Sequence, residues 1–497
     1  MDELIPLSNA ALGRMPDRVR VPGYDRKALS AGIVHIGLGN FHRAHQAWYL
    51  HRLFDLGLCH DWAIIGAGVR RNDAVTRDRL IAQDCLTTLV ELDPAGMSAE
   101  ICGSMIDFLP VEDGNGALIK AMTDPAIRIV ALTVTEGGYY IDAVTGAFDT
   151  AHPDIVHDAA HPDSPRTAFG AMVAALKQRR ATGAGPFTGQ SCDNLQGNGA
   201  VLRQAVVGLA RLSDPDLADW IDNNCSFPNA MVDCIVPATG PRELELVKGF
   251  GIADAAPVTH ENFRQWVIED DFCNGRPDWD KTGATFTDRV HDFETMKLRI
   301  LNGGHQVIAV PGEILGINSI AETMQNPAIR GLLRKVMTDE VARHVAPVPG
   351  FTALEYLDLI DRRFSNPEIA DTTRRVAFDG SSRQTGFVIP SIRDGLRSGA
   401  PVTGLALVSA LWARYCQGTR EDGSSVDPND PHWETLHTTA QKARKRPRAW
   451  LEMEQYYGDL ATQTPFAEAF DGWLSMINAK GTEAAISAYL QGEGVSR

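Results

Sequence analysis

Short apolar runs alternate with helical patterns along the first half of the chain. Runs of strand length lie at residues 33–36, 62–69, 85–91 and 127–134, and again near 187–192 and 231–236. Helical patterns cover residues 41–56 and a segment that opens with Ser164 as its N-cap and Pro165 as its first residue. Continuous apolar strands that alternate with helices are typical of a parallel sheet covered on both faces. The pattern therefore predicts a Rossmann-like, doubly wound α/β domain.

Helical periodicity takes over after about residue 285. Helices are predicted at residues 295–310, 326–346, 352–363, 401–416, 435–446 and 465–490. A chain of 497 residues is too long for one ordinary core, since a domain usually holds about 100–200 residues. We therefore predict a Rossmann-like dinucleotide-binding domain at residues 1–285 and a mainly helical substrate and catalytic domain at residues 286–497.

The composition narrows the classes of partner. The chain is 44% hydrophobic and 22% charged, as expected of a globular protein, and its eight cysteines form no CxxC pair, which favours reduced thiols. The formal net charge of -16 argues against a nucleic-acid partner and slightly favours a neutral substrate. The acidic start lacks a signal peptide, and no run reaches the roughly 18 apolar residues that span a bilayer. We expect a cytoplasmic monomer or small homo-oligomer without a membrane partner.

A glycine turn follows the first strand. The residues read GLGNFH from Gly37 to His42, so only the first two glycines of the GxGxxG dinucleotide motif are present and His42 holds the third place. A plain strand-to-helix turn is an equally good interpretation of the pattern alone. Arg43 either pairs with a phosphate or is an exposed arginine of the first helical turn. The candidate cofactor-binding residues here are Gly37, Leu38, Gly39, Asn40, Phe41, His42 and Arg43.

The end of the second strand leaves the choice of cofactor open. Asp73 can accept a hydrogen bond from the ribose 2′-hydroxyl of NAD, whereas Arg70 and Arg71 can accommodate the 2′-phosphate of NADP or be solvated. His42 and His45 are spaced to share a metal ion, but the sequence offers no third ligand near them. We expect NAD, with NADP possible, and no metal.

A second group of polar residues lies on a predicted helix. At about 3.6 residues per turn, Lys297, Asn302 and His305 fall within an arc of roughly 140°. Hydride removal from a carbinol needs a base, and a lysine can serve if its pKa is lowered from about 10.4 toward neutrality. The Asn302 amide can donate to the oxygen on which negative charge develops. A solvated helix face explains the same three residues without any chemistry.

Five motifs in order resemble one family. They are GLGNFHRAHQ (37–46), TEGGY (135–139), SCDNL (191–195), NAMVD (229–233) and the Lys297, Asn302, His305 set. Together they resemble the mannitol dehydrogenase family of polyol-specific long-chain dehydrogenases, over residues 33 to about 390. The resemblance implies a Rossmann-like domain, a mainly helical C-terminal domain and a metal-free active site in the cleft between them.

The resemblance also implies roles for individual residues. Lys297 becomes the general base in alcohol oxidation and the general acid in ketone reduction, while Asn194 and Asn302 hold the oxyanion. His305 orients the substrate, and Glu294 lies at the mouth of a proton path unless it is only an exposed first-turn glutamate. Glu136, in the second motif, joins the cofactor-binding residues.

The remaining matches concern the substrate. Asp233, Arg375 and Arg383 match substrate-side positions, although a buried structural aspartate is the better interpretation of Asp233. Two departures from the family pattern are Cys234, where a base is usual, and Arg383, where the family has lysine. A lysine-to-arginine change alters hydrogen bonding to hydroxyls. The two departures therefore bear on the choice of substrate rather than on the chemistry.

The implied function is a polyol dehydrogenase that interconverts a sugar alcohol such as D-mannitol and its ketose, fructose, with NAD(P). One alternative is a sugar-acid reductase acting on fructuronate and mannonate, for which Arg375 and Arg383 would supply cations. A second alternative is a nicotinamide-binding sensor without catalysis, which the presence of the lysine, both amides and the histidine disfavours.

Overall fold

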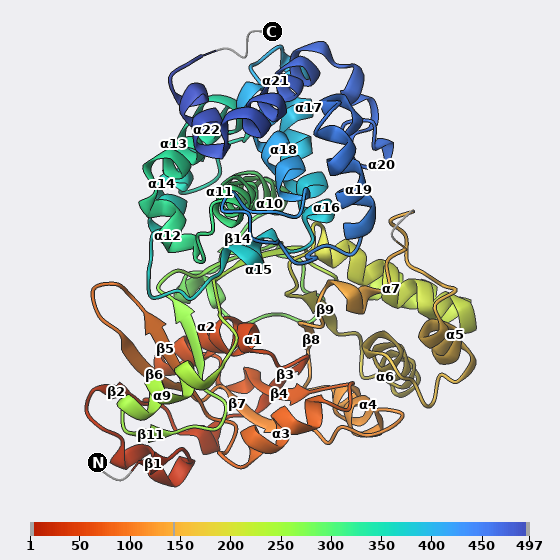
Figure 1. Cartoon of the computed structure of the whole chain (residues 1–497). Helices are drawn as coiled ribbons and strands as arrows, with labels where there is room; N and C mark the ends of the chain where they lie inside the picture. Colours follow the sequence, from red (N-terminus) through yellow and green to blue (C-terminus); the bar gives the residue numbers. More distant parts are fainter. Residues whose placement is uncertain (1–3, 143–144, 494–497) are drawn as a thin grey trace. The chain divides into compact units, whose positions relative to one another are not determined.

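The computed structural model describes residues 4–142 and 145–493. The chain forms two compact units, Met1–His291 and Asp292–Arg497 (Figure 1). The division falls in helix α10 (Val290–Met296), a few residues after the predicted boundary. No helix within the described part of the chain is both long and apolar enough to cross a bilayer.

A five-stranded parallel sheet organises the first unit. Its order is β7 (Met105–Phe108), β4 (Ala63–Ala67), β3 (Ala31–Ile36), β8 (Ile129–Leu132) and β9 (Thr188–Ser191). From β3 the chain first builds the sheet outward through β4 and β7, and then returns to β8 on the other side. Ligands of such sheets bind at the carboxyl ends of the strands where the order reverses. That point lies between β3 and β8.

Neighbouring residues of a strand point to opposite sides of the sheet, and both of these sides are covered by helices. Val34, Ile36, Val130 and Leu132 pack against α4, α6 and α7, whereas Ile33, Ile64, Ile129 and Ala131 pack against α2. The helices of this unit are α1 (Asn40–Ala44), α2 (Gln46–Asp55), α3 (Asp73–Ile81), α4 (Gly116–Thr123), α5 (Pro153–Ala160), α6 (Ala168–Thr182), α7 (Asn198–Ser213), α8 (Pro215–Asn224) and α9 (Pro241–Gly249). The predicted doubly wound α/β fold is confirmed.

Two predicted strands belong to other sheets. Strand β5 (Thr87–Leu92) pairs with β12 (Val258–Glu261) and, antiparallel, with β6 (Ser98–Cys102), in a sheet that β2 (Val19–Arg20) completes. Strand β10 (Ala230–Asp233) pairs antiparallel with β13 (Gln265–Ile268), which also pairs with β14 (Thr285–Phe286). Their assignment to the parallel sheet is therefore wrong. An apolar run reports that a strand is buried but does not identify its partner.

Several predicted helix limits are also corrected. The segment expected to begin at Ser164 begins at Ala168, because Thr167 is the N-cap and accepts the N–H of Gly170. The helix predicted at residues 41–56 is interrupted at His45, which has a non-helical conformation. The helix predicted at 465–490 divides at Gly481, whose φ of +91° ends α21 (Thr464–Lys480) before α22 (Thr482–Leu490).

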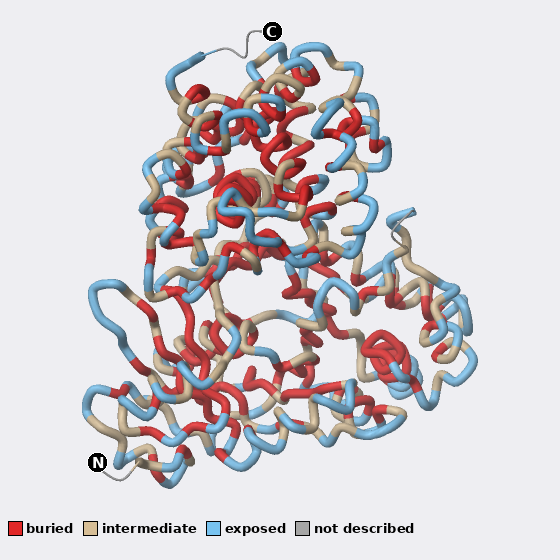
Figure 2. Tube along the Cα trace, in the orientation of Figure 1, coloured by how far each residue is buried: buried red, intermediate tan, exposed pale blue. Residues whose placement is uncertain are grey.

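The second unit is mainly helical, as predicted. Helices α11 (Gly303–Ile314) and α18 (Thr403–Tyr415) are buried along nearly their whole length, as Figure 2 shows in red. The others are α12 (Ile320–Gln325), α13 (Pro327–Val336), α14 (Ala353–Phe364), α15 (Thr373–Ala377), α16 (Gly380–Arg383), α17 (Ile389–Ser398), α19 (Trp433–Ala443) and α20 (Glu454–Tyr457), besides α10, α21 and α22. Among the residues described up to 493, three π-helical turns interrupt them, at Lys297–Asn302, Met337–Val341 and Gln384–Val388.

Candidate active-site residues

The glycine turn directly follows β3, at the point where the strand order reverses. Gly37 has a φ of +92°, and a Cβ at this position would collide with the backbone carbonyl of Thr133. Gly39 is exposed, and a Cβ there would meet open space. Leu38 packs tightly over Gly66 of β4. The first glycine is therefore required by the fold, whereas the second leaves the backbone accessible to a ligand.

Asn40 and Arg43 make their contacts within the first unit. The Asn40 amide donates to the carbonyl of Pro237 and to Thr239 Oγ1, and Asn40 Oδ1 accepts from Arg43 at 2.7 Å. Arg43 is 4% exposed and also donates to the carbonyls of Gly39 and Ala256. The interpretation of Arg43 as an exposed arginine is therefore wrong. A cavity of about 510 Å³ opens beside both residues.

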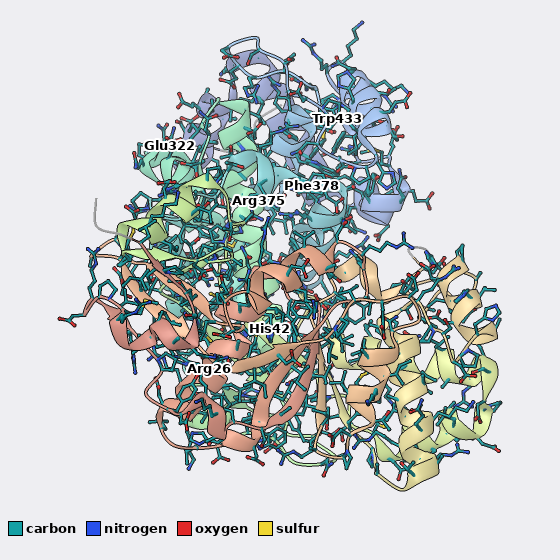
Figure 3. The ribbon with its side chains drawn as sticks, turned by 90° about the horizontal axis from the view of Figure 1, so that it is seen from below. Arg26, His42, Glu322, Arg375, Phe378 and Trp433 are labelled. Carbon is teal, nitrogen blue, oxygen red and sulfur yellow. The ribbon has the colours of Figure 1, made fainter. Side chains whose placement is uncertain are left out.

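His42 occupies the place of the third glycine and is buried (Figure 3). Its ring stacks on His35 with the ring centroids 3.4 Å apart, and neither ring nitrogen of His42 has a hydrogen-bond partner. His45 Nε2 instead lies 3.0 Å from the carbonyl of Gln265. Among residues 4–142 and 145–493, no three His, Cys, Asp or Glu side chains are placed to hold a metal ion. Phe41 stacks on His45.

Asp73 lies where a ribose-binding acid is expected. Its carboxylate accepts the N–H of Arg70 at 2.9 Å, and it lies against Gly68 just after β4, where a Cβ would collide with it. The side chain of Arg71 is 90% exposed and forms a loose ion pair with Asp113. Arg70 and Glu136 are also exposed. After β4 the side chain that is fixed in place is therefore that of Asp73, whereas Arg70 and Arg71 are exposed.

The SCDNL motif contains a residue to which the sequence analysis assigned no role. Asp193 is buried, and its carboxylate accepts the N–H groups of Val134 and Thr135 and the hydroxyl of Tyr139. Burial raises the pKa of this carboxyl, while these hydrogen bonds oppose the rise. Asn194 follows and is exposed. A sequence clue existed, because an acid directly after a buried strand of a parallel sheet lies at the ligand-binding edge.

Asp233, at the end of β10, is 5% exposed. Its backbone pairs with Gln265 of β13. Burial agrees with the structural interpretation of this acid, and its place in substrate binding stays a prediction. Cys234 follows it and is also buried.

Lys297 and Asn302 lie at the two ends of the π-helical turn Lys297–Asn302, which corrects the α-helical geometry assumed from the sequence. In a π-helix the closing hydrogen bond joins residues five apart. Asn302 therefore lies one turn above Lys297 and on the same face, rather than about 140° around an α-helix. Lys297 is 8% exposed and Glu294 is 5% exposed. The interpretations of both as solvated residues are wrong, although a role in proton relay stays a prediction for Glu294.

His305 lies one turn further along, in α11. Its ring stacks on Phe364 of α14, with the centroids 4.1 Å apart, and its Nε2 has no hydrogen-bond partner. Burial lowers the pKa of His305 to about 3, so the ring is neutral near pH 7. A neutral imidazole with a free nitrogen can exchange hydrogen bonds with a hydroxyl.

Arg375 and Arg383 both lie close enough to His305 to lower its pKa. Asp371 is buried and binds Arg375 through both oxygens, at 2.6 Å to Nε and 2.5 Å to Nη2. The Arg375 side chain is 61% exposed (Figure 3). Arg383 donates from Nη1 to the carbonyl of Val376, which also accepts from Gln306 of α11. Asp371 is a second residue that the sequence analysis missed, although its spacing four residues before Arg375 is typical of an ion pair.

Family models match both units. Residues 31–281 match the model described as the mannitol dehydrogenase Rossmann domain, and residues 289–477 match the mannitol dehydrogenase C-terminal domain. The chain is 57% identical to mannitol 2-dehydrogenase of Cereibacter sphaeroides over 476 residues, which cover 96% of this chain and 100% of that protein.

Two solved structures are similar over nearly the full chain. One is Pseudomonas fluorescens mannitol 2-dehydrogenase in a ternary complex with NAD and D-mannitol, at 41% identity and a TM-score of 0.87, covering 98% of this chain and 99% of that one. The other is D-sorbitol dehydrogenase in a substrate-free form, at 33% identity and a TM-score of 0.89, covering 97% and 100%.

Proposed function

The chain belongs to the mannitol dehydrogenase family, and on that premise we propose that it is an NAD-dependent polyol dehydrogenase. Its substrate is D-mannitol or a close analogue, which it oxidises at a secondary carbinol to the ketose, fructose in the case of mannitol. The observation that carries the proposal is the π-helical turn, which brings a buried lysine and an amide onto one face. Dinucleotide binding is assigned to residues 1–285 and substrate chemistry to residues 286–497.

The reaction moves one hydride and one proton. Lys297 takes the hydroxyl proton on its Nζ as the carbon–oxygen double bond forms, and returns a proton during ketone reduction. Asn194 and Asn302 donate amide N–H groups to the oxygen while it carries negative charge. His305, neutral and stacked on Phe364, holds a neighbouring hydroxyl. Glu294 relays the proton from Lys297 toward solvent.

The glycine turn and the loop after β8 suit a dinucleotide. Gly37, Leu38, Gly39, Asn40, Phe41, His42 and Arg43 build the turn, Glu136 lies after β8 and Asp73 after β4. When bound, the nicotinamide supplies the acceptor for the hydride. Asp73 favours NAD over NADP because a carboxylate accepts from a ribose hydroxyl but repels a 2′-phosphate. Since the lysine and amides provide the acid, base and oxyanion contacts, we infer that the reaction needs no metal.

The Asp371–Arg375 pair favours a neutral polyol over a sugar acid. A bidentate carboxylate neutralises the guanidinium and leaves its Nη1 edge for further donation. Such a donor suits a hydroxyl, whereas a substrate carboxylate would meet little net charge at Arg375. Asp233, Arg375 and Arg383 are the proposed substrate-side residues, and Arg383 keeps the sugar-acid reaction as the second candidate.

The test is Lys297→Ala with Lys335→Ala as its control. Lys335 lies on α13 and pairs with Asp339, so it shares the charge but not the site. We expect Lys297→Ala to lower kcat for mannitol oxidation by about 10²–10⁴-fold with an unchanged melting temperature, and Lys335→Ala to keep kcat. Near-normal turnover of Lys297→Ala would contradict the assignment.

The same assay separates the alternatives. The kcat/KM values are compared for mannitol and fructose against mannonate and fructuronate, with NAD and with NADP, before and after EDTA dialysis. We expect the polyol with NAD to be preferred and EDTA to have no effect. Tight NAD binding without turnover of any polyol would instead favour a sensor.

A further inference from the structure

A buried carboxylate joins two loops at the carboxyl edge of the parallel sheet. Strands β8 and β9 are neighbours, with Leu132 paired to Ser191, so the segments that follow them emerge side by side. Residues 133–139 follow β8 and contain the TEGGY motif, and Asp193 and Asn194 follow β9. The side chain of Asp193 bridges these two segments.

Three donors converge on this carboxylate. Oδ2 accepts the N–H of Val134 at 3.0 Å and the hydroxyl of Tyr139 at 2.7 Å, and Oδ1 accepts the N–H of Thr135 at 2.9 Å. Tyr139 is fully buried, and its hydroxyl also lies 2.5 Å from Ser191 Oγ. All three donors are neutral groups, so hydrogen bonds to them, rather than an ion pair with them, hold the carboxylate. These hydrogen bonds fix the position of the carboxylate and the positions of the three donors.

The backbone that Asp193 holds is strained. Thr135 has φ +68° and ψ 162°, a region of backbone conformation that is almost exclusively populated by glycine. A β-branched residue is especially unfavourable there. Such a conformation persists only where surrounding contacts fix it. The N–H groups of Val134 and Thr135 both donate to the Asp193 carboxylate, and these two hydrogen bonds provide that restraint.

The same loop reaches the glycine turn. Thr133 Oγ1 donates to the carbonyl of Gly37 and lies 2.8 Å from His35 Nε2. On the other side, Asn198 donates to the carbonyl of Asp193 at 3.0 Å and is bonded to both backbone groups of Ala230. Asp193 therefore lies between a loop that contacts the glycine turn and the fixed backbone from which Asn194 extends.

We propose that Asp193 is a positioning residue that holds residues 133–139 in their dinucleotide-binding conformation and Asn194 in its catalytic position. The inference rests on the proposed function, because it assumes NAD at the glycine turn and substrate at Asn194. If Asp193 only stabilised the fold, its replacement would affect NAD affinity no more than the replacement of another buried carboxylate with similar hydrogen bonds.

Asp158 provides a matched control. It is buried in the same unit, and its carboxylate likewise accepts two backbone N–H groups, from Arg166 and Thr167, and the hydroxyl of Thr167. It lies on α5, outside the loops that end at the glycine turn and Asn194. Asp193→Asn and Asp158→Asn therefore each remove one negative charge from two backbone N–H groups and a hydroxyl, and Asp158 in addition lies 3.1 Å from His157 Nδ1.

The experiment measures the Kd of NAD by titration and the kcat for mannitol by steady-state assay. We expect Asp193→Asn to raise the Kd at least about tenfold, the effect of one lost charge-assisted hydrogen bond, and to lower kcat. Asp158→Asn should keep the Kd within about twofold while lowering the melting temperature. Asp193→Glu keeps the charge but displaces the oxygens, and should also raise the Kd. A Kd for either Asp193 variant within twofold of the wild type would overturn the proposal.

Rescue distinguishes positioning from general stability. Glycine adopts the Thr135 conformation without strain. Adding Thr135→Gly to Asp193→Asn should therefore recover most of the lost NAD affinity, whereas adding it to Asp158→Asn should change nothing. Failure of this rescue would show that Asp193 does not act through the strained loop. Because NAD binding is measured without turnover, absence of polyol oxidation by the wild type would refute the proposed function and leave the Asp193 test intact.

Discussion

Asp371 changes what Arg375 can recognise. An arginine near a sugar site suggests an anionic substrate, but here a carboxylate that is 5% exposed takes the Nε and Nη2 edge of the guanidinium. Asp371 lies four residues before the arginine, just ahead of the N-cap of α15, and it raises the pKa of Arg375 through their hydrogen bonds. The pair donates hydrogen bonds yet carries little net charge. Under the proposed assignment of Arg375 to the substrate, substrate choice at this position depends on a residue that need not touch the substrate.

Asp371→Asn should change the preference between a sugar acid and a neutral sugar. Removing the negative charge frees the charge of Arg375, so the ratio of kcat/KM for fructuronate to that for fructose should rise about tenfold or more. Asp361→Asn is the control, because Asp361 forms a similar bidentate pair with Arg330 elsewhere in the second unit. An unchanged ratio in Asp371→Asn would contradict the role given to the pair.

At the scale of an element, the start of α6 shows how tertiary contacts select one cap among several. Ser164 and Pro165 form a good helix start by sequence, yet Thr167 caps the helix. Asp158 accepts both the N–H and the hydroxyl of Thr167, and Asn115 donates to the carbonyl of Pro165. These contacts fix residues before Ala168 in a non-helical conformation.

The two candidate caps can be compared directly. Thr167→Ala removes the side-chain oxygen that accepts the N–H of Gly170, and should lower the free energy of unfolding by about 1–2 kcal/mol. Ser164→Ala changes an exposed side chain outside the helix and should lie within about 0.5 kcal/mol of the wild type. Chemical denaturation of both variants measures the difference. Equal losses of unfolding free energy in the two variants would contradict the assignment of Thr167 as the N-cap.

At the scale of the whole molecule, buried imidazoles couple stability to pH. Burial lowers the pKa of His35, His260 and His305 to about 3 and that of His51 to about 4, and it lowers the pKa of His42 well below its ordinary value. The unfolded chain protonates its histidines near pH 6.5. Below that pH the unfolded state therefore binds more protons than the folded state, which favours unfolding.

We therefore expect the melting temperature to fall as the pH drops from 7 to 5. Burial also raises the pKa of some carboxyls, among them Asp193, Glu340 and the half-buried Glu91, and these shifts act in the opposite direction. Calorimetry at intervals of 0.5 pH unit tests the slope. His260→Gln, which removes a buried histidine of β12, should make the slope shallower. A melting temperature that is constant or rises toward pH 5 would contradict this account.

Sequence reasoning reached much of the fold and the family, for identifiable reasons. The runs at residues 33–36 and 127–134 gave β3 and β8 because continuous apolar strands mark a buried parallel sheet. The residues proposed for the site came from motifs in order, and their roles stay predictions. Asp193 and Asp371 were missed because what distinguishes each is a contact, with the loop after β8 or with Arg375, and such a contact is not visible in a list of side chains.

The sequence by itself determined the order of strands and helices in outline, the doubly wound class of the first unit and the family, since hydrophobic periodicity and motif order are local properties of the chain. The tertiary structure decided which strands pair, and it places β5 and β10 in sheets other than the parallel one. It also decided that Lys297 and Asn302 share one face of a π-helical turn, and that Thr135 has a conformation suited to glycine. Strand partners, a π-turn and a strained residue all depend on long-range packing and hydrogen bonds, which no local pattern encodes.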